Sequence, residues 1–129
     1  MNEYKEILAI DLAKNYRDEN MSVEKYLFGV QKLIESNIYI TKINNTLFMH
    51  KDLGDDVIEF HVANADSARM LIKNCKQFLQ SISLQNFSKA ITFFDNLKLD
   101  VIFVGMGFPY VTQQVNLGKY ATYKTEVSL

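Results

Sequence analysis

Three stretches of the chain carry apolar residues at every third or fourth position, which is the spacing of an amphipathic α-helix. This pattern predicts helices over residues 2–18, 22–36 and 67–82. The apolar stripe of the first helix is formed by Tyr4, Ile7, Leu8 and Leu12. Asp11 falls outside that stripe and is assigned to the polar side of the helix.

Capping residues support the second and third helices. Ser22 stands where an N-cap is expected, and either Asp66 or Ser67 can cap the third helix. The apolar face of the second helix is formed by Tyr26, Leu27, Val30, Leu33 and Ile34. The predicted buried stripe of the third helix comprises Ala68, Leu71, Cys75, Phe78, Leu79 and Ile82.

Between the second and third helices the hydrophobic pattern changes to a period of two, which is typical of β-strands. Residues 38–43 and 46–50 flank Asn44-Asn45, a pair that tolerates positive φ and therefore predicts a β-hairpin. A second turn is expected over residues 52–56.

The third predicted strand, residues 57–63, separates apolar from polar side chains. Its apolar face carries Ile58, Phe60 and Val62. Glu59 and His61 lie on the opposite face. Beyond the third helix, residues 90–94 are aromatic and β-branched, which predicts another strand.

The last third of the chain is harder to assign. Residues 97–104 are ambiguous, because residues 101–104 have strand propensity. Two further strands are expected over residues 108–115 and 120–127. Helices that alternate with strands in this order indicate a mixed α/β (α+β) fold, and the lack of a linker or repeat indicates one domain over residues 1–129.

Composition and charge narrow the classes of function. Lysine and arginine total 14 against 15 acidic residues, giving a formal net charge of −1, so nothing attracts the whole chain to nucleic acid or to an anionic membrane. No apolar run has the length of a membrane span, and no signal peptide is visible. Cys75 is the only cysteine, which excludes an internal disulfide and fits a reducing compartment, or a virion assembled in one.

The order of elements resembles the GNAT acyltransferase fold without its first strand. That fold commonly has an asparagine at a strand end and, eleven residues later, a Gly-Phe pair that closes a short helix. Here Asn96 is followed at that spacing by Gly107-Phe108. The resemblance implies that residues 97–104 form this helix despite their propensity. It also implies a mixed, mostly antiparallel sheet of about six strands flanked by helices.

Two departures from the family pattern imply a loss of catalysis. In these enzymes the loop that binds the CoA pyrophosphate is glycine-rich, because glycine lets backbone N–H groups approach phosphate. Residues 63–68 contain no glycine and place Asp66 where the polyanion would bind. Many of these enzymes also protonate the leaving thiolate with a tyrosine seven residues after the asparagine. Phe103 stands at that position and cannot donate a proton.

Some residues of a transferase site are nevertheless in place. Glu59 lies on the strand where the family often has its general base, and His61 shares its face. Both are catalytic candidates, although we favour a solvated sheet face for them. Asn64, Ser67 and Asn96 are the corresponding candidates for binding acetyl-CoA.

Other polar and reactive residues have simpler explanations. His50 and His61 lack the cysteine or carboxylate neighbours of a metal site, so we expect no metal there. Cys75 lies on an apolar stripe, which favours core packing over nucleophilic chemistry. The basic residues of the third helix could bind phosphate, but a solvated helix face is favoured. They are Arg69, Lys73 and Lys76.

The C-terminal hairpin is rich in aromatic residues. They are Phe108, Tyr110, Tyr120 and Tyr123. Such side chains suit a protein-binding surface and a sheet core equally well. The tail, residues 125–129, has no polar cap and could pair with the edge of another chain, including a second copy in a homo-oligomer.

Three functions remain open, and we favour the first. It is a catalytically degenerate structural or interaction component, similar to the small internal virion protein of T7-like phages. That resemblance implies a minor internal or tail-associated protein of a podovirus-type particle, with other virion proteins as partners. The second is a divergent acetyl-CoA-dependent N-acetyltransferase that uses Glu59 or His61 as base. The third is a phage-encoded regulator that binds a host protein in the host cytoplasm.

Overall fold

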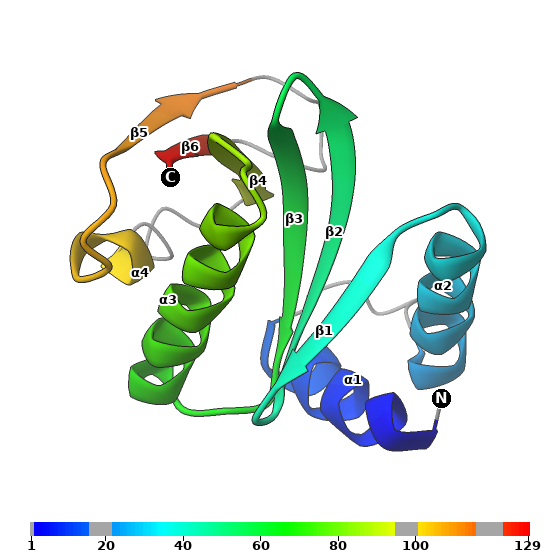
Figure 1. The fold of residues 1–129 in the computed structure, drawn as a ribbon. Helices are drawn as coiled ribbons and strands as arrows, with labels where there is room; N and C mark the ends of the chain where they lie inside the picture. The colour runs from blue at the N-terminus through cyan, green and yellow to red at the C-terminus, as the bar shows by residue number, and fades with distance from the viewer. Residues whose placement is uncertain (1, 16–21, 95–100, 116–122) are drawn as a thin grey trace.

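A computed structural model describes residues 2–15, 22–94, 101–115 and 123–129 of the chain. These residues form four helices and six strands (Figure 1). The elements are, in chain order, α1 (Asn2–Asn15), α2 (Val23–Glu35), β1 (Tyr39–Ile43), β2 (Thr46–Gly54), β3 (Val57–Asn64), α3 (Ala68–Leu84), β4 (Lys89–Phe94), α4 (Val101–Val104), β5 (Tyr110–Gln114) and β6 (Tyr123–Ser128).

The six strands form one sheet in the order β1-β2-β3-β4-β6-β5. Every neighbouring pair is antiparallel except β3 and β4, which run parallel because α3 connects them. The expected fold class, a mixed and mostly antiparallel sheet of about six strands flanked by helices, is confirmed.

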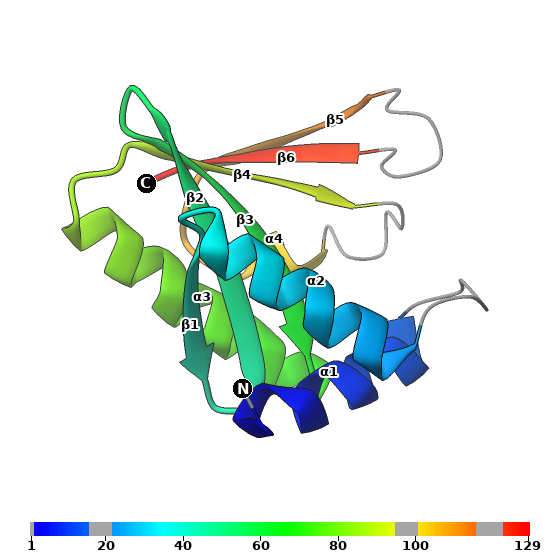
Figure 2. The same cartoon turned by 90° about the vertical axis from the view of Figure 1, so that its right-hand side faces the viewer.

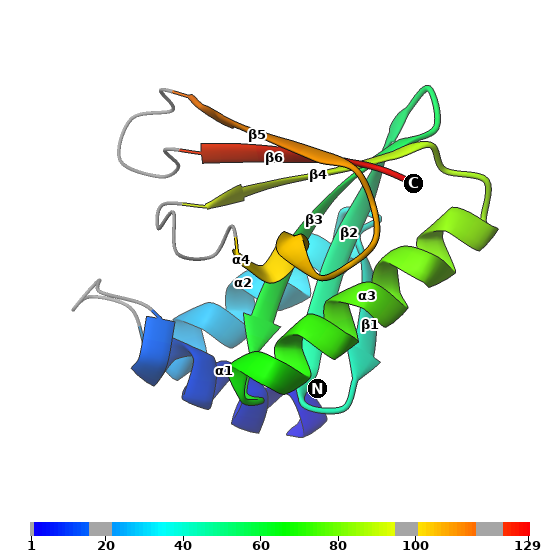
Figure 3. The ribbon, with the colours of Figure 1, turned by 90° about the vertical axis from the view of Figure 1, so that its left-hand side faces the viewer.

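Helices cover both faces of the sheet. Successive side chains of a strand point to opposite faces, and β2 carries apolar side chains on both. On β2, Leu47 and Met49 pack into a cluster with α1 and α2, whereas Phe48 packs on the opposite face with α3. Figures 2 and 3 show α1 and α2 on one side of β1–β3 and α3 on the other. The main core lies under α3 and includes Phe60 and Phe78.

Strands β3 and β4 pair over a short distance and then diverge. Their register joins Val57 to Lys89, Ile58 to Ala90 and Glu59 to Ile91. Beyond this point residues 60–64 of β3 still pair with β2 but no longer with β4. The two halves of the sheet therefore separate into a V, seen in Figure 3. Helix α4 lies beside α3 (Figure 1).

The predicted hairpin, N-caps and third helix are confirmed, with some corrections at their ends. Asn44 has φ 51° and joins β1 to β2. The second turn was expected too early: β2 continues to Gly54, and the turn is made by Asp55 and Asp56, with φ 57° and 62°. Ala68 is exposed although we placed it on the buried stripe of α3.

The first two helices also differ from the prediction in their polar and apolar faces. Ile34, assigned to the apolar face of α2, is largely exposed because it lies near the C-terminal end of that helix. Helix α1 is described to Asn15, and residues 16–18 of its predicted range lie outside the described residues. In the described part of the chain, no helix is long and apolar enough to cross a membrane.

The C-terminal part confirms one prediction and overturns another. Residues 101–104 form helix α4, as the resemblance implied, while residues 97–100 lie outside the described residues. The expected edge at the tail is wrong, because β6 lies between β4 and β5. Ser128 N donates to Pro109 O and Leu129 N to Ser88 O, so the tail is held on both sides. The edge strand at this end of the sheet is β5.

Candidate functional site

The candidate site lies where β3 ends and α3 begins, at the open end of the V. Ser67 is the N-cap of α3: its Oγ accepts from Met70 N at 3.2 Å, and its carbonyl oxygen accepts from Leu71 N at 2.8 Å. Within the described ranges, the amides of Ser67, Ala68 and Arg69 donate to no protein acceptor. A helix start with unpaired N–H groups carries a partial positive charge that attracts anions.

Asp66 does not occupy these amides, which corrects the sequence-based expectation that its carboxylate would compete with phosphate for them. The carboxylate points instead to the β1–β2 turn. Asp66 Oδ2 accepts from Asn45 N at 2.9 Å and from Asn74 Nδ2 at 2.8 Å. Thr46 Oγ1 lies 3.3 Å from the same oxygen. The helix capping role belongs to Ser67 alone.

Asn64 and Ser67, two of the predicted cofactor-binding residues, are brought together at this loop. The side chain of Asn64 is engaged inside the protein: its Oδ1 accepts from Thr46 Oγ1 at 2.8 Å, and its Nδ2 donates to Asp66 O at 2.8 Å. It therefore shapes the loop and is not directed at a ligand. The third candidate, Asn96, lies outside the described residues.

Two residues that sequence patterns missed lie in the interior beside this loop. Asp11 was assigned to the polar side of α1 but is only 4% exposed, and its Oδ1 accepts from Asn64 N at 2.9 Å. Asn74 occupies a buried position of α3, at 1% exposure, and its amide reaches Thr46 and Asp66. Asn74 does follow the same helical spacing as the apolar residues of α3, which is the one signal that could have found it.

Glu59 and His61 lie side by side on one face of β3. The same face is covered by α1 and α2 at the end of the strand, where Ala63 packs against them. His61 Nε2 is 3.6 Å from Glu59 Oε2, and their side chains are 49% and 29% exposed. Glu59 is the last residue of β3 that pairs with β4, so its carboxylate lies at the apex of the V. A carboxylate and an imidazole at this distance, both reachable from solvent, can accept a proton from a bound amine.

Phe103 lies on α4 and is buried at 6% exposure. It belongs to the core under α3, with its ring centroid 5.8 Å from that of Tyr110. Phe108 and Tyr110 also pack against this core, and Tyr123 stacks on Phe94. The described aromatic residues of the C-terminal hairpin are thus half-buried, while Tyr120 lies outside the described residues.

The two histidines lie on opposite faces of the sheet, so they cannot share a cation. His50 pairs with Phe60 in the register and faces α3, whereas His61 faces away. The His50 ring stacks on Tyr39 at 5.3 Å and contacts Phe78 at 5.6 Å. Burial lowers its pKa, an effect that the nearby Asp52 carboxylate opposes. No group of three metal-ligating residues occurs among residues that the structure describes.

The cysteine is a core residue, and the basic residues of α3 lie on the surface. Cys75 is buried in the main core, and burial raises the pKa of its thiol to about 12, so it is not a nucleophile at neutral pH. Arg69, Lys73 and Lys76 are exposed along α3. Arg69 is in the first turn, next to the unpaired amides.

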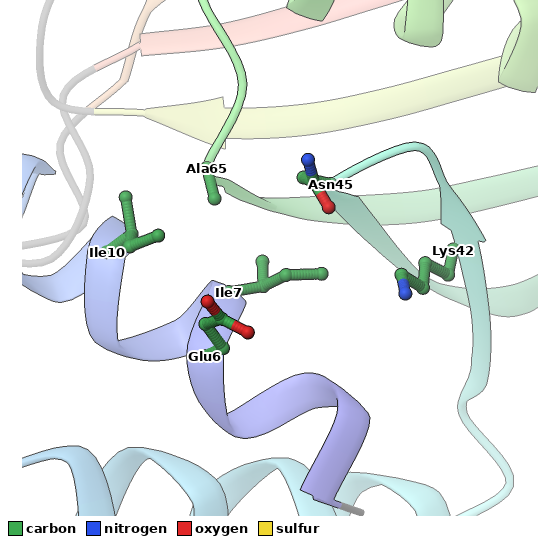
Figure 4. A pocket seen from close by; sticks show the side chains of 6 residues that line it. All are labelled: Glu6, Ile7, Ile10, Lys42, Asn45 and Ala65. Atoms are coloured by element: carbon green, nitrogen blue, oxygen red, sulfur yellow. The ribbon is translucent and has the colours of Figure 1, made fainter.

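A small cavity of about 140 Å³ lies on the other side of the β3–α3 loop. Figure 4 shows that α1 and the β1–β2 hairpin form its walls. Glu6 projects from α1 and Lys42 from β1, on opposite sides of the cavity, and Ala65 closes one end. It is too small for a nucleotide-sized ligand, whose sites are typically about 300–1,000 Å³.

Comparisons with known proteins place the fold but not the family. No protein-family model matches the sequence, and no curated protein resembles it at significant similarity. Among solved structures, a ribosomal-protein-alanine N-acetyltransferase from Brucella melitensis superposes with a TM-score of 0.65 at 11% identity, over 99% of this chain and 95% of that one. An N-acetyltransferase from Staphylococcus aureus Mu50 gives 0.63 at 12% identity, over 99% and 92%.

A third solved structure is a chimera of spermidine N-acetyltransferase from Vibrio cholerae with hSSAT, with a TM-score of 0.59 at 11% identity over 99% of this chain and 91% of that one. The chain therefore has the GNAT acetyltransferase fold along its whole length. The resemblance to a phage virion protein gains no support from these structures.

Proposed function

We propose that the chain is a divergent N-acetyltransferase that takes its acetyl group from acetyl-CoA. The observation that carries this proposal is the divergence of β3 from β4 directly after Glu59, with the unpaired start of α3 at the open end. The same fold in N-acetyltransferases of several bacteria supports it. At 11–12% identity the fold does not specify the acceptor amine.

The residues at the start of α3 fit a phosphate-bearing ligand. Ser67 and Ala68 lie in the loop that is glycine-rich in the family pattern, and both are exposed and have small side chains. The amides of Ser67, Ala68 and Arg69 are free to donate to phosphate oxygens, and the Arg69 guanidinium adds a full charge. The open edge of β3, residues 60–64, offers further peptide groups to the amides of a pantetheine chain.

The chemistry at the apex of the V requires a proton acceptor. An attacking amine loses a proton as it forms the new amide bond, and the thioester carbon expels the CoA thiolate. Glu59 is placed to take this proton, either directly or through His61 at 3.6 Å. We assign Glu59 as the base because it is the nearer of the two to the apex.

The leaving group has no acid in the position where the family often has one, because Phe103 carries no hydroxyl. A thiol of ordinary pKa, about 8.5, is a good leaving group compared with an amine or an alcohol, so it can depart without an acid, but more slowly than with one. General acid catalysis contributes about 10²–10⁴ in rate. We therefore expect a slow transferase.

Calorimetry with acetyl-CoA, followed by thiol-release assays with peptide N-terminal amines and polyamines, tests the proposal. We expect saturable binding and slow, amine-dependent release of CoA. Glu59→Gln should still bind acetyl-CoA but release CoA at least about tenfold more slowly, since glutamine has the shape of glutamate but cannot act as the base. No heat at millimolar acetyl-CoA would overturn the proposal.

A binding role without turnover is the second candidate, and the burial of Phe103 in the core favours it. In this case the chain would be an interaction component: a minor virion protein of a podovirus-type phage, or a regulator of a host protein. If it acts as a homo-oligomer through its C-terminal hairpin, strand β5 has to form the contact, because β6 is already paired on both sides. Release of CoA by the wild type but not by Glu59→Gln would exclude this candidate.

A further inference from the structure

We propose that Asp66 is a positioning residue that holds the start of α3 in the orientation needed to bind the pyrophosphate of CoA. This inference rests on the proposed function and adds a positioning residue to the proposed binding site. It concerns the β3–α3 loop, residues 65–67, and the groups that surround the Asp66 carboxylate.

Three neutral groups of the described residues donate to this carboxylate, and the Thr46 hydroxyl, which donates to Asn64 Oδ1, lies beside it. Asp66 Oδ2 accepts from Asn45 N at 2.9 Å and Asn74 Nδ2 at 2.8 Å, and Thr46 Oγ1 lies 3.3 Å away. Asp66 Oδ1 accepts from Asn45 Nδ2 at 3.3 Å. Both oxygens are therefore used as acceptors, which only a carboxylate offers. An asparagine in its place would turn an NH₂ group toward other donors.

The backbone of the loop is fixed by the same cluster. Asp66 N donates to Asn64 Oδ1 at 3.1 Å, and Asp66 O accepts from Asn64 Nδ2 at 2.8 Å. Ala65 N donates to Asn45 O at 2.9 Å. The peptide groups on either side of Asp66 thus have defined partners, and the loop is attached to the β1–β2 turn.

The hydrogen bonds around the Asp66 carboxylate also extend to α3. Asn74 lies two turns into that helix and is buried, so its bond to Asp66 fixes the direction of the helix relative to the loop. Asn44 Nδ2 donates to Asn74 Oδ1 at 2.8 Å, which attaches Asn74 to the turn as well. The unpaired amides of Ser67, Ala68 and Arg69 follow directly, so their directions are set before any ligand binds. Such preorganisation improves affinity by lowering the cost of ordering.

The affinities of CoA and of pantetheine, which lacks the pyrophosphate, separate positioning from mere folding. Asp66→Asn should weaken CoA binding by about tenfold, comparable to the loss of one charge-assisted hydrogen bond, and change pantetheine binding by less than about twofold. Asp52→Asn is the matched control: Asp52 also accepts a backbone N–H, that of Gly54 at 2.8 Å, but at the opposite end of the sheet. It should leave both affinities unchanged.

The outcomes are distinct. If the wild type binds neither ligand, the proposed function fails. If the wild type binds CoA and Asp66→Asn binds it equally well, Asp66 does not position the site although the function stands. An equal loss of affinity for both ligands would mean that the variant disturbs the fold in general, and would also overturn the inference. Should Asp66→Asn fail to fold, Thr46→Val removes the hydroxyl that donates to Asn64 and accepts from Asn74, and should give the same selective loss, at about threefold.

Discussion

Replacement of Asp11 by alanine should destabilise the fold strongly, because its carboxylate connects three elements in the interior. Asp11 Oδ1 accepts from Asn64 N at the end of β3, and Asp11 Oδ2 accepts from Tyr26 Oη on α2, both at 2.9 Å. Asp11 itself is on α1 and almost wholly buried. Both donors are partly buried, and each would lose its bond to a charged acceptor.

The size of the effect follows from these two bonds. A hydrogen bond to a charged partner contributes about 1.5–3 kcal/mol, so Asp11→Ala should lower the free energy of unfolding by about 3–6 kcal/mol. Single domains are stable by only about 5–15 kcal/mol, so the variant loses a large share of the total. Tyr26→Phe removes the bond to Asp11 but keeps the bond from Asn64, and should cost about half as much.

Urea denaturation followed by far-UV circular dichroism measures these differences, provided that the m-value stays constant across the variants. Asp11→Asn should fall between wild type and Asp11→Ala, since its amide oxygen can still accept one bond. A loss below about 1 kcal/mol for Asp11→Ala, or a loss equal to that of Tyr26→Phe, would show that the bond to Asn64 does not hold α1 against β3.

Two further predictions concern His50 and Phe103. Burial lowers the pKa of His50 from 6.5, so below that pH the unfolded chain takes up a proton that the folded chain resists. The free energy of unfolding should therefore fall as the pH drops below about 6.5. In thermal melts, His50→Phe should lose this pH dependence and His61→Gln should keep it. An unchanged slope in His50→Phe would contradict the buried, neutral ring. Phe103→Tyr should raise the rate of thiol release, by about 10² if its hydroxyl reaches the thiolate. Phe87→Tyr, in the connection between α3 and β4, should not. Equal rates for Phe103→Tyr and wild type would show that position 103 is not where an acid can act.

Local sequence patterns predicted the structure correctly wherever residues close in sequence determine it. The Asn44-Asn45 turn joins two strands of period two, and the structure pairs Ile43 with Thr46 directly across it. Ser67 caps α3 because its hydroxyl reaches an amide three residues later. Helix α4 could not be predicted in this way, since residues 101–104 favour a strand; only the resemblance of the whole chain to a known fold indicated it.

The V between β3 and β4 lies beyond any local pattern. Val57 and Lys89 are paired although 17 residues of α3 lie between their strands, and the pairing stops after Glu59 and Ile91. Nothing in the alternation of β3 marks this point, because Phe60 continues the same apolar face toward α3. Where the two strands part therefore depends on the arrangement of the assembled domain.

Two buried polar residues that sequence patterns did not identify lead to one conclusion about the site. Asp11 and Asn74 each occupy an interior position of a helix where an apolar side chain would avoid the cost of burying a polar group. Both are directed at the same short stretch, the end of β3 and the loop to α3, where they reach Asn64 N and the Asp66 carboxylate. Packing alone does not require this, since the main core under α3 is filled by apolar side chains. Satisfied buried networks impose a unique geometry, so their concentration here argues that the orientation of this loop matters for binding.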